Sequence, residues 1–341
     1  MFCSYPQEIP ASLFACASLT RLRASRCSFP EVPVAAAGAA SPLPRLTEIE
    51  LRQVAISEES LNALLSQCTA LERLQIWSAN QCGRVHIRSP SLKIFNSDGQ
   101  FDELFVEYAP NLERMLGEYM YMRAGSQRGV RLKVKHAPKL EFMGYLGMNF
   151  EAIEIGEAIF KEGQVHVNSM RPSLKTLAVE VSYTSVGYIN WIIHLLELFP
   201  CLETLYIRSD TWSTIQDPAP ESWDLLRHVP CIDNHLEKVV FEVYRGHEWQ
   251  REMAKFIHGK SRFLKDMEFH CVDDSGSPGH FKRPSIEWVR NQQELLCLDS
   301  RASKNARFLF FDGQLVCNHH DICHHEWYKR EYYSNLLEVC V

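Results

Sequence analysis

The feature that most constrains this 341-residue chain is a short apolar motif that recurs along its length. Each copy has a proline or cysteine lead-in, then a leucine, two variable residues, an apolar residue, one variable residue and another apolar residue. The clearest copies begin at Leu46, Leu71, Leu174, Leu202, Leu236 and Leu264, and weaker ones at Leu19, Leu92, Leu112 and Leu140. These first leucines are spaced about 27 residues apart on average, so the chain repeats one structural unit.

The motif and its spacing predict how each unit folds. The last two apolar residues of a motif alternate with period two, which indicates a short strand with one buried face. The chain must then travel out and back before it starts a parallel neighbour, and residues 57–65 and 185–199 have the apolar spacing of helices that do this. A single unit cannot bury its own apolar face. We therefore expect a leucine-rich-repeat solenoid, an irregular horseshoe of parallel strands with outer helices or arcs.

Composition and charge limit the partners and the compartment. The longest apolar stretch, residues 188–200, is interrupted by His194 and Glu197 and is too short to cross a bilayer. A net charge of −6 without a large basic block argues against nucleic acid, and we expect no membrane partner either. The first residues lack the pattern of a secretory signal, and 12 cysteines are scattered through the chain. These observations favour the cytoplasm, the nucleus or both.

The repeats, together with residues 235–269, resemble plant F-box/LRR/FBD proteins. Residues 235–246 read HLEKVVFEVYRG, 253–257 read MAKFI, and 263–269 read FLKDMEF. This is similar to the FBD pattern of a strand, a Tyr-x-Gly turn, a helix and a second strand. We therefore divide the chain into leucine-rich repeats at 1–233, an FBD-like segment at 234–272 that continues and closes the solenoid, and a C-terminal cap with a His/Cys-rich tail at 273–341.

The resemblance implies the target-recognition part of a Skp-cullin-F-box ubiquitin ligase. Such proteins begin with a helical F-box that docks the ligase adaptor. No F-box pattern precedes residues 13–19, so we expect ligase components as partners only if such a module lies upstream.

One region near the end of the chain has side chains that suit a metal. Cys317, His319, Cys323 and His325 are zinc-ligand types, but they lie too close together to fold a zinc finger around a core. We expect a polar tail and no metal.

Catalytic motifs are absent from the sequence. Residues 125–129 lack the Lys-Ser/Thr that a phosphate-binding loop needs, and no Gly-x-Ser-x-Gly occurs. We expect neither enzymatic activity nor a cofactor.

In a solenoid of parallel strands, the side chains that alternate with the buried ones form the binding face, on the concave side. Trp, Tyr, Phe and Arg are enriched at the energetic centres of protein interfaces. The predicted partner-binding residues are Arg73, Gln75, Trp77, Phe142, Glu180, Tyr206, Arg208 and Lys238. Among these we expect Arg73, Trp77, Tyr206 and Arg208 to anchor the partner.

Three hypotheses for the function follow from the sequence. The first is target recognition for a ubiquitin ligase, with the identity of the bound protein open. The second is a free-standing repeat scaffold or competitor without a ubiquitin role. The third is a small-molecule receptor with its ligand on the concave face.

Overall fold

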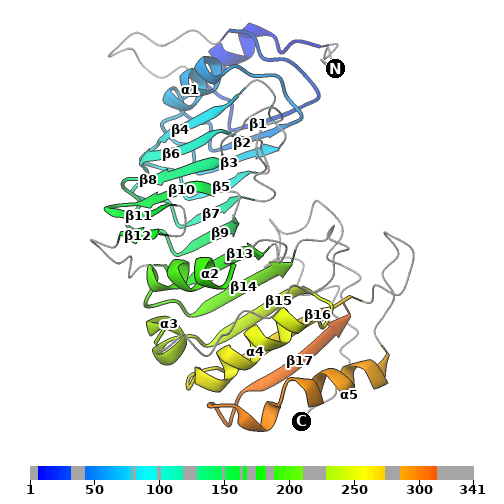
Figure 1. Cartoon of the computed structure of the whole chain (residues 1–341). Helices are drawn as coiled ribbons and strands as arrows, with labels where there is room; N and C mark the ends of the chain where they lie inside the picture. Colours follow the sequence, from blue (N-terminus) through cyan, green and yellow to red (C-terminus); the bar gives the residue numbers. More distant parts are fainter. Residues whose placement is uncertain are drawn as a thin grey trace. The chain divides into compact units, whose positions relative to one another are not determined.

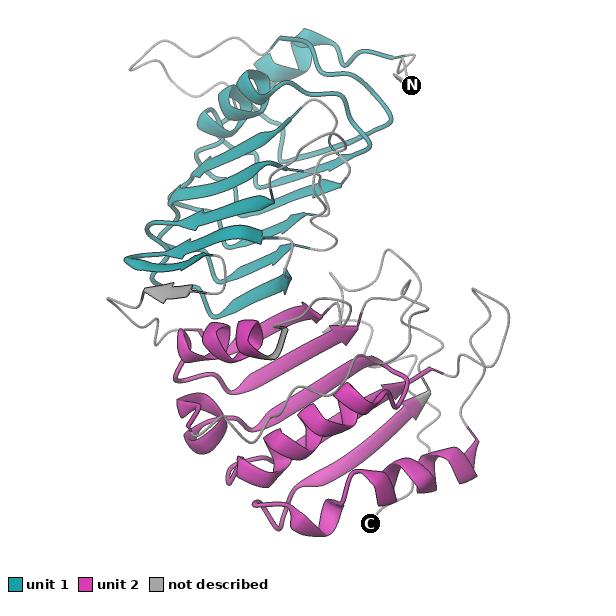
Figure 2. Cartoon of the chain, viewed as in Figure 1, with its two compact units in different colours: residues 1–169 teal, residues 170–341 magenta. Residues whose placement is uncertain are grey.

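The computed structural model forms two compact units, residues 1–169 and 170–341 (Figure 2). The structure describes residues 7–31, 43–77, 79, 82–97, 101–117, 129–147, 150–161, 164–166, 174–181, 188–209, 228–272 and 285–312. Each unit is described by itself below.

The first unit contains a parallel sheet whose strands come from successive repeats, in the order β1-β2-β3-β5-β7-β9. These strands are β1 (Arg21–Ser25), β2 (Glu48–Arg52), β3 (Arg73–Trp77), β5 (Ile94–Ser97), β7 (Arg114–Gly117) and β9 (Phe142–Gly147). Corresponding motif positions are paired across strands: Ile49 lies beside Leu74, and Leu51 beside Ile76. We call this sheet the repeat sheet of unit 1.

A second sheet takes the place of most of the helices that were expected on the other side of unit 1 (Figure 1). Its strands are β4 (Arg84–Arg88), β6 (Glu103–Tyr108), β8 (Val130–Val134), β10 (Phe150–Ile155), β11 (Ala158–Lys161) and β12 (Gln164–His166). The first four pair in parallel, and β11 and β12 complete the sheet as antiparallel strands. The reason is local: β4 alternates exposed and buried residues, with Val85 and Ile87 inward, so it has the period of a strand.

Two short helical segments accompany these sheets among the described residues of unit 1. The 3-10 helix η1 (Ala11–Ala15) precedes β1, and helix α1 (Glu58–Ser66) connects β2 to β3. The Ser57 side chain accepts a hydrogen bond of 3.1 Å from the Ser60 N–H, and Leu61, Leu64 and Leu65 are buried, so the expected helix at 57–65 is confirmed.

The second unit alternates parallel strands with helices. Its sheet has the order β13-β14-β15-β16-β17. The strands are β13 (Thr176–Val181), β14 (Thr204–Ser209), β15 (Lys238–Tyr244), β16 (Asp266–Cys271) and β17 (Arg307–Asp312). The helices are α2 (Tyr188–Glu197), α3 (Pro230–Asn234), α4 (Glu248–Lys260), α5 (Ile286–Leu295) and the 3-10 helix η3 (Leu298–Ser300). We call this sheet the repeat sheet of unit 2.

The repeat leucines form the core of both units. From Leu46 to Leu264 the first leucine of each motif is at most 4% exposed, including the weaker copies at Leu92, Leu112 and Leu140. Only Leu19, in the first copy, is half-buried. The fold is therefore the expected leucine-rich-repeat solenoid, made mostly of parallel strands.

The FBD-like segment forms the expected strand–helix–strand, with β15, α4 and β16. Trp249, Met253 and Ile257 of α4 are buried, whereas Phe256 and Lys260, which the helical spacing of the sequence places on the same stripe, are half-buried. The segment does not close the solenoid, because β17 pairs in parallel with β16 and adds one more unit after it. The domain boundaries predicted at residues 233 and 272 separate sequence patterns, whereas the division at residue 169 separates compact units. The predicted boundaries therefore stay a prediction. No helix among the described residues is both long and apolar enough to span a membrane.

Candidate protein-binding faces of the two repeat sheets

Each strand of a repeat sheet points alternate side chains away from the leucine core. In unit 1 we call these side chains the repeat face of unit 1. They are Arg21, Arg23, Ser25, Glu48, Glu50, Arg52, Arg73, Gln75, Trp77, Ile94, Asn96, Arg114, Leu116, Phe142 and Gly144. This face contains five arginines and two glutamates, so its formal net charge is +3.

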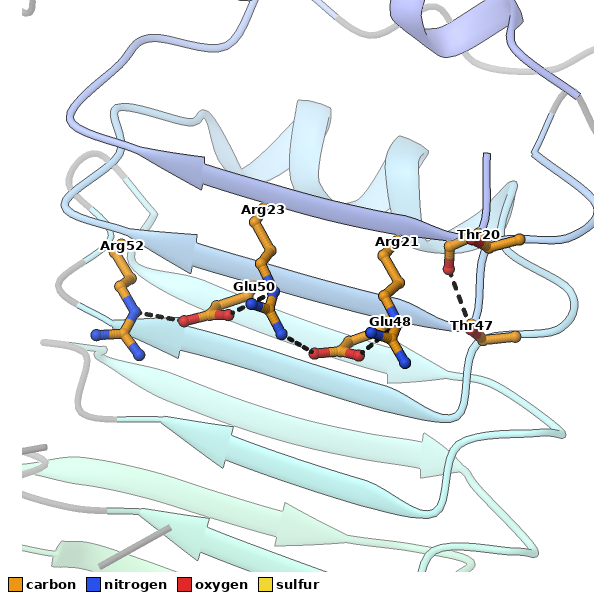
Figure 3. Close-up of polar contacts among 7 residues, drawn as sticks. All are labelled: Thr20, Arg21, Arg23, Thr47, Glu48, Glu50 and Arg52. Carbon is orange, nitrogen blue, oxygen red and sulfur yellow. Dashed lines mark hydrogen bonds and ion pairs between the residues drawn. The ribbon is translucent and has the colours of Figure 1, made fainter. Parts of the chain in front are cut away.

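The first two strands of this face hold a ladder of alternating charge, which Figure 3 shows. Glu48 pairs with Arg21 and Arg23, each at 3.3 Å, and Glu50 pairs with Arg23 at 3.2 Å and with Arg52. The glutamate side chains are 15% and 11% exposed, whereas those of Arg21 and Arg23 are 68% and 64% exposed. The carboxylates therefore lie low on the sheet and hold the guanidinium groups above them at fixed spacing.

Aromatic rings lie beside two arginines of the same face, Arg52 of the ladder and Arg114. The guanidinium carbon of Arg52 lies 5.9 Å from the centre of the Trp77 ring, and that of Arg114 lies 4.7 Å from the centre of the Phe142 ring. Such cation–π contacts stabilise the arrangement modestly at exposed sites. They also fix the orientation of rings that are themselves half-exposed.

In unit 2 we call the corresponding side chains the repeat face of unit 2. They are Thr176, Ala178, Glu180, Thr204, Tyr206, Arg208, Lys238, Val240, Glu242, Asp266, Glu268, His270, Arg307, Leu309 and Phe311. This face contains three basic and four acidic residues, so its formal net charge is −1 with His270 counted as neutral. The two repeat faces thus differ in sign.

Glu268 is the most strongly perturbed carboxylate of this face. Burial on its own would raise its pKa, but the nearby His270 side chain and the hydrogen bond and charge of Lys238 outweigh burial and lower the pKa to about 2. Its Oε1 lies 2.5 Å from Lys238 Nζ, and its Oε2 lies 3.6 Å from His270 Nε2. Lys238 is therefore already held by a neighbouring strand.

Arg208 and Glu242 form a buried ion pair on the same face. Arg208 Nε donates to Glu242 Oε2 at 3.1 Å, and both side chains are only 2% exposed. The prediction that Arg208 lies exposed and anchors a partner is therefore wrong about its exposure. Alternation along the strand correctly predicts that Arg208 points away from the leucine core. It does not predict whether other parts of the chain bury the side chain there.

A buried polar network lies at the end of β15, where the FBD pattern begins its turn. Val243 has a positive φ of 57°, and its carbonyl accepts hydrogen bonds from Ser209 Oγ at 2.7 Å and Gln250 Nε2 at 3.1 Å. Gln250 Oε1 in turn accepts from the backbone N–H groups of Arg245 and His247. The network thus provides hydrogen-bond partners for the Val243 carbonyl and the N–H groups of Arg245 and His247 at this turn.

The Tyr-x-Gly element of the FBD pattern packs on α5. The Tyr244 hydroxyl donates to Gln292 Oε1 at 3.0 Å, and Gly246 adopts a φ of +73°. A Cβ at Gly246 would lie 2.6 Å from Gln292 Oε1. The glycine is thus required both for its backbone conformation and for this close approach.

The other predicted partner-binding residues retain some exposure. Arg73 is exposed, and the half-buried ones are Gln75, Trp77, Phe142, Glu180, Tyr206 and Lys238. The structure brings Arg73, Gln75 and Trp77 together on β3. Of the four predicted anchors, Arg73 and Trp77 belong to unit 1, and Tyr206 and Arg208 to unit 2.

Arg21 and Arg23, the two most exposed members of the ladder, are not among the partner-binding residues predicted from the sequence. The signal was present, because they are the alternating residues of the weak repeat that begins at Leu19. Residues 84–88 likewise alternate polar and apolar side chains, which is the sequence pattern of a strand.

A metal site is not seen in the part of the chain that the structure describes, where no three His, Cys, Asp or Glu side chains gather suitably. The candidate ligands Cys317, His319, Cys323 and His325 lie outside the described residues.

Comparison with known proteins gives two family matches. Residues 2–207 match the family model described as "FBD-associated F-box protein At5g56370, LRR repeats", and residues 227–269 match the FBD model. The first match ends in β14, and the second contains β15, α4 and the first four residues of β16. No solved structure matches.

Three Arabidopsis thaliana proteins are similar to the chain. FBD-associated F-box protein At3g52670 is 26% identical over 61% of this chain and 49% of its own length. Putative F-box/FBD/LRR-repeat protein At3g49480 is 24% identical over 76% of this chain and 60% of its own length. F-box/FBD/LRR-repeat protein At1g13570 is 32% identical over 31% of this chain and 24% of its own length. The chain therefore spans less than two thirds of each relative, and it belongs to the plant leucine-rich-repeat family of FBD-associated F-box proteins.

Proposed function

We propose that this chain is a protein-binding module that recognises its partner through the repeat faces. We propose further that it is the target-recognition part of an F-box/LRR/FBD protein in a Skp-cullin-F-box ubiquitin ligase, acting in the cytoplasm or nucleus. It carries out no catalysis of its own and needs no cofactor. The partner is a protein, and neither nucleic acid nor a membrane takes its place.

One observation carries the proposal. The repeat face of unit 1 presents arginine and tryptophan side chains that are partly exposed and already held in place by their neighbours, as with Arg52 against Trp77. Arginine and tryptophan are the residues most enriched at energetic centres of protein interfaces. Groups ordered before binding lose less conformational entropy when a partner arrives.

The opposite side of unit 1 offers a matched control surface. We call the side chains of β4, β6, β8, β10 and β11 that point away from the core the return face. Five basic and four acidic residues lie there, namely Arg84, Arg88, Arg131, Lys133 and Lys161 with Glu103, Glu107, Glu151 and Glu154. The charges are nearly balanced, and Lys133 pairs with Glu154 at 2.6 Å.

The test is affinity capture from plant cells with the full chain and two variants, read by quantitative mass spectrometry. The first variant carries Arg73→Ala, Trp77→Ala and Tyr206→Ala. The control carries Arg84→Ala, Phe105→Ala and Lys133→Ala on the return face. Proteins lost from the first variant and kept by the control support recognition through the repeat faces. Equal recovery with both variants contradicts it.

The ubiquitin-ligase role has its own measurement. The ubiquitination of the captured partner is measured with the gene intact and deleted, together with recovery of a Skp adaptor subunit. A fall in ubiquitination after deletion, with the adaptor recovered from intact cells, supports the role. Stable capture with unchanged ubiquitination favours a scaffold or competitor. A small molecule released from the purified chain on denaturation would favour a receptor.

A further inference from the structure

The repeat face of unit 1 combines a net positive charge with guanidinium groups that retain free hydrogen-bonding capacity. Arg21 reaches Glu48 through Nε, and its side chain is 68% exposed. Within the described residues, Arg73 forms no ion pair and no side-chain hydrogen bond, and it is exposed. A guanidinium has five N–H donors, so Arg21 keeps donors beyond the Nε that reaches Glu48.

We infer that this face binds an extended, acidic segment of the partner protein, in which aspartate or glutamate recurs at every second residue. The inference rests on the proposed function and names the chemistry of the partner. Its basis is charge complementarity with the face that carries +3, in contrast to the −1 of the repeat face of unit 2 and the nearly balanced return face.

The spacing of the arginines fits such a segment. Arg21 and Arg23 lie two residues apart on one strand, so they repeat at about 6.6 Å, the same distance as alternate side chains of an extended peptide. Arg73 lies in the same row as Arg21, two strands away, with Glu48 between them. Carboxylates above Arg21 and Arg23 would each meet a guanidinium in the planar, two-donor geometry that arginine offers to carboxylates, and Arg73 adds positive charge beside them.

The charge pattern favours a carboxylate-bearing peptide over a nucleic acid. Glu48 and Glu50 interrupt the arginines on this face, and the whole chain carries −6. A continuous phosphate backbone would pass over both glutamates, and binding to it needs a run of cations that this face does not have. Carboxylates on alternate residues can lie over the arginines and avoid the glutamates.

The test uses fluorescence anisotropy with three labelled probes of about six units each, matched to the length of the strands in the face. They are a peptide alternating glutamate and threonine, one alternating glutamine and threonine, and oligothymidylate. The proteins are the full chain, the variant Arg21→Gln, Arg23→Gln, Arg73→Gln, and the control Arg84→Gln, Arg88→Gln, Arg131→Gln. Both variants remove three positive charges from unit 1, and thermal melting confirms that both are folded.

We expect the glutamate peptide to bind the full chain and the control equally well, and to bind the first variant about tenfold more weakly. High salt should weaken its binding to the full chain. The glutamine peptide should bind at least about tenfold more weakly than the glutamate peptide. No binding of the glutamate peptide, or equal losses in both variants, overturns the inference. Tighter binding of oligothymidylate also overturns it and indicates a nucleic-acid partner.

The same variants separate this inference from the proposed function. If capture of partners from cells is lost with the variant Arg73→Ala, Trp77→Ala, Tyr206→Ala but persists at high salt with the variant Arg21→Gln, Arg23→Gln, Arg73→Gln, the faces bind protein and the inference of an acidic partner is wrong. If neither variant affects capture, the proposed function fails as well.

Discussion

Arg208 and Glu242 form an ion pair inside unit 2, with Arg208 Nε 3.1 Å from Glu242 Oε2 and both side chains 2% exposed. The two residues lie side by side on β14 and β15, 34 positions apart in the sequence. Two charges taken out of water are tolerated only when each compensates the other. The pair therefore couples the last strand matched by the repeat model to the first strand of the FBD segment.

Breaking this pair should be more costly than replacing it. We expect Arg208→Met or Glu242→Leu alone to lower the free energy of unfolding by about 3–5 kcal/mol, because the remaining charge stays buried without its partner. The double variant Arg208→Met, Glu242→Leu should lose markedly less than the sum of the two. Chemical denaturation of all four proteins gives the coupling energy, and simple additivity would show that the pair is not energetically linked.

Two glycines of the FBD segment should respond in opposite directions to alanine. Gly246→Ala forces a Cβ into a positive-φ position and against Gln292 Oε1, which also displaces the acceptor of the Tyr244 hydroxyl. We expect a loss of about 1–3 kcal/mol. Gly259 lies in α4, and a Cβ added there would have nothing within 4 Å. We therefore expect Gly259→Ala to raise the free energy of unfolding by about 0.5–1 kcal/mol.

Thermal and chemical unfolding measure both glycine variants. A Gly246→Ala protein as stable as the natural chain would mean that Gln292 moves aside without cost and that the backbone relaxes.

Unit 2 should lose stability in strong acid because of Glu268. Its pKa of about 2 lies below the value of 4.5 for an unperturbed glutamate, so the unfolded chain takes up the proton first. The stabilisation is complete above about pH 4.5 and is lost as the pH falls towards 2, in total about 3 kcal/mol. In Glu268→Gln this pH dependence should be absent.

The control for Glu268 is Glu203→Gln, which removes a carboxylate that pairs with Lys175 at 3.5 Å and is 47% exposed. Exposed pairs contribute little, so its acid dependence should match that of the natural chain. Identical acid curves for all three proteins would show that Glu268 does not stabilise the fold.

A second pH effect should come from His258 in α4, at milder acidity. Burial is the main reason that its pKa is lowered from 6.5, and its Nε2 lies 3.0 Å from the carbonyl oxygen of Leu296. The unfolded chain therefore binds a proton before the folded chain does, and stability should fall as the pH drops below 6.5. Urea unfolding of the natural chain and His258→Gln between about pH 7 and 5 measures this. The variant should show a smaller slope, and equal slopes would exclude His258 as the cause.

The amino-acid sequence by itself determined the repeat. Leucines at regular spacing predicted parallel strands with a shared apolar interior, and Leu51, Ile76, Val179 and Ile207 are all buried within their own units. The Ser57 cap and the buried residues of α4 were also predictable, because capping and helical periodicity are local properties. The FBD pattern likewise identified β15, α4 and β16.

Only the tertiary structure decided which side chains of the repeat faces remain accessible. Strand alternation shows which side of a sheet a residue lies on, but burial depends on segments that are distant in the sequence. Thus Arg73 is exposed and Arg208 is buried, although both alternate with core residues in the same way. The close approach of Gly246 to Gln292, 46 positions apart, and the ladder of Arg21, Glu48 and Arg23 across β1 and β2 depend on the register between strands and helices. Register is set by packing of the whole unit, so no single motif contains it.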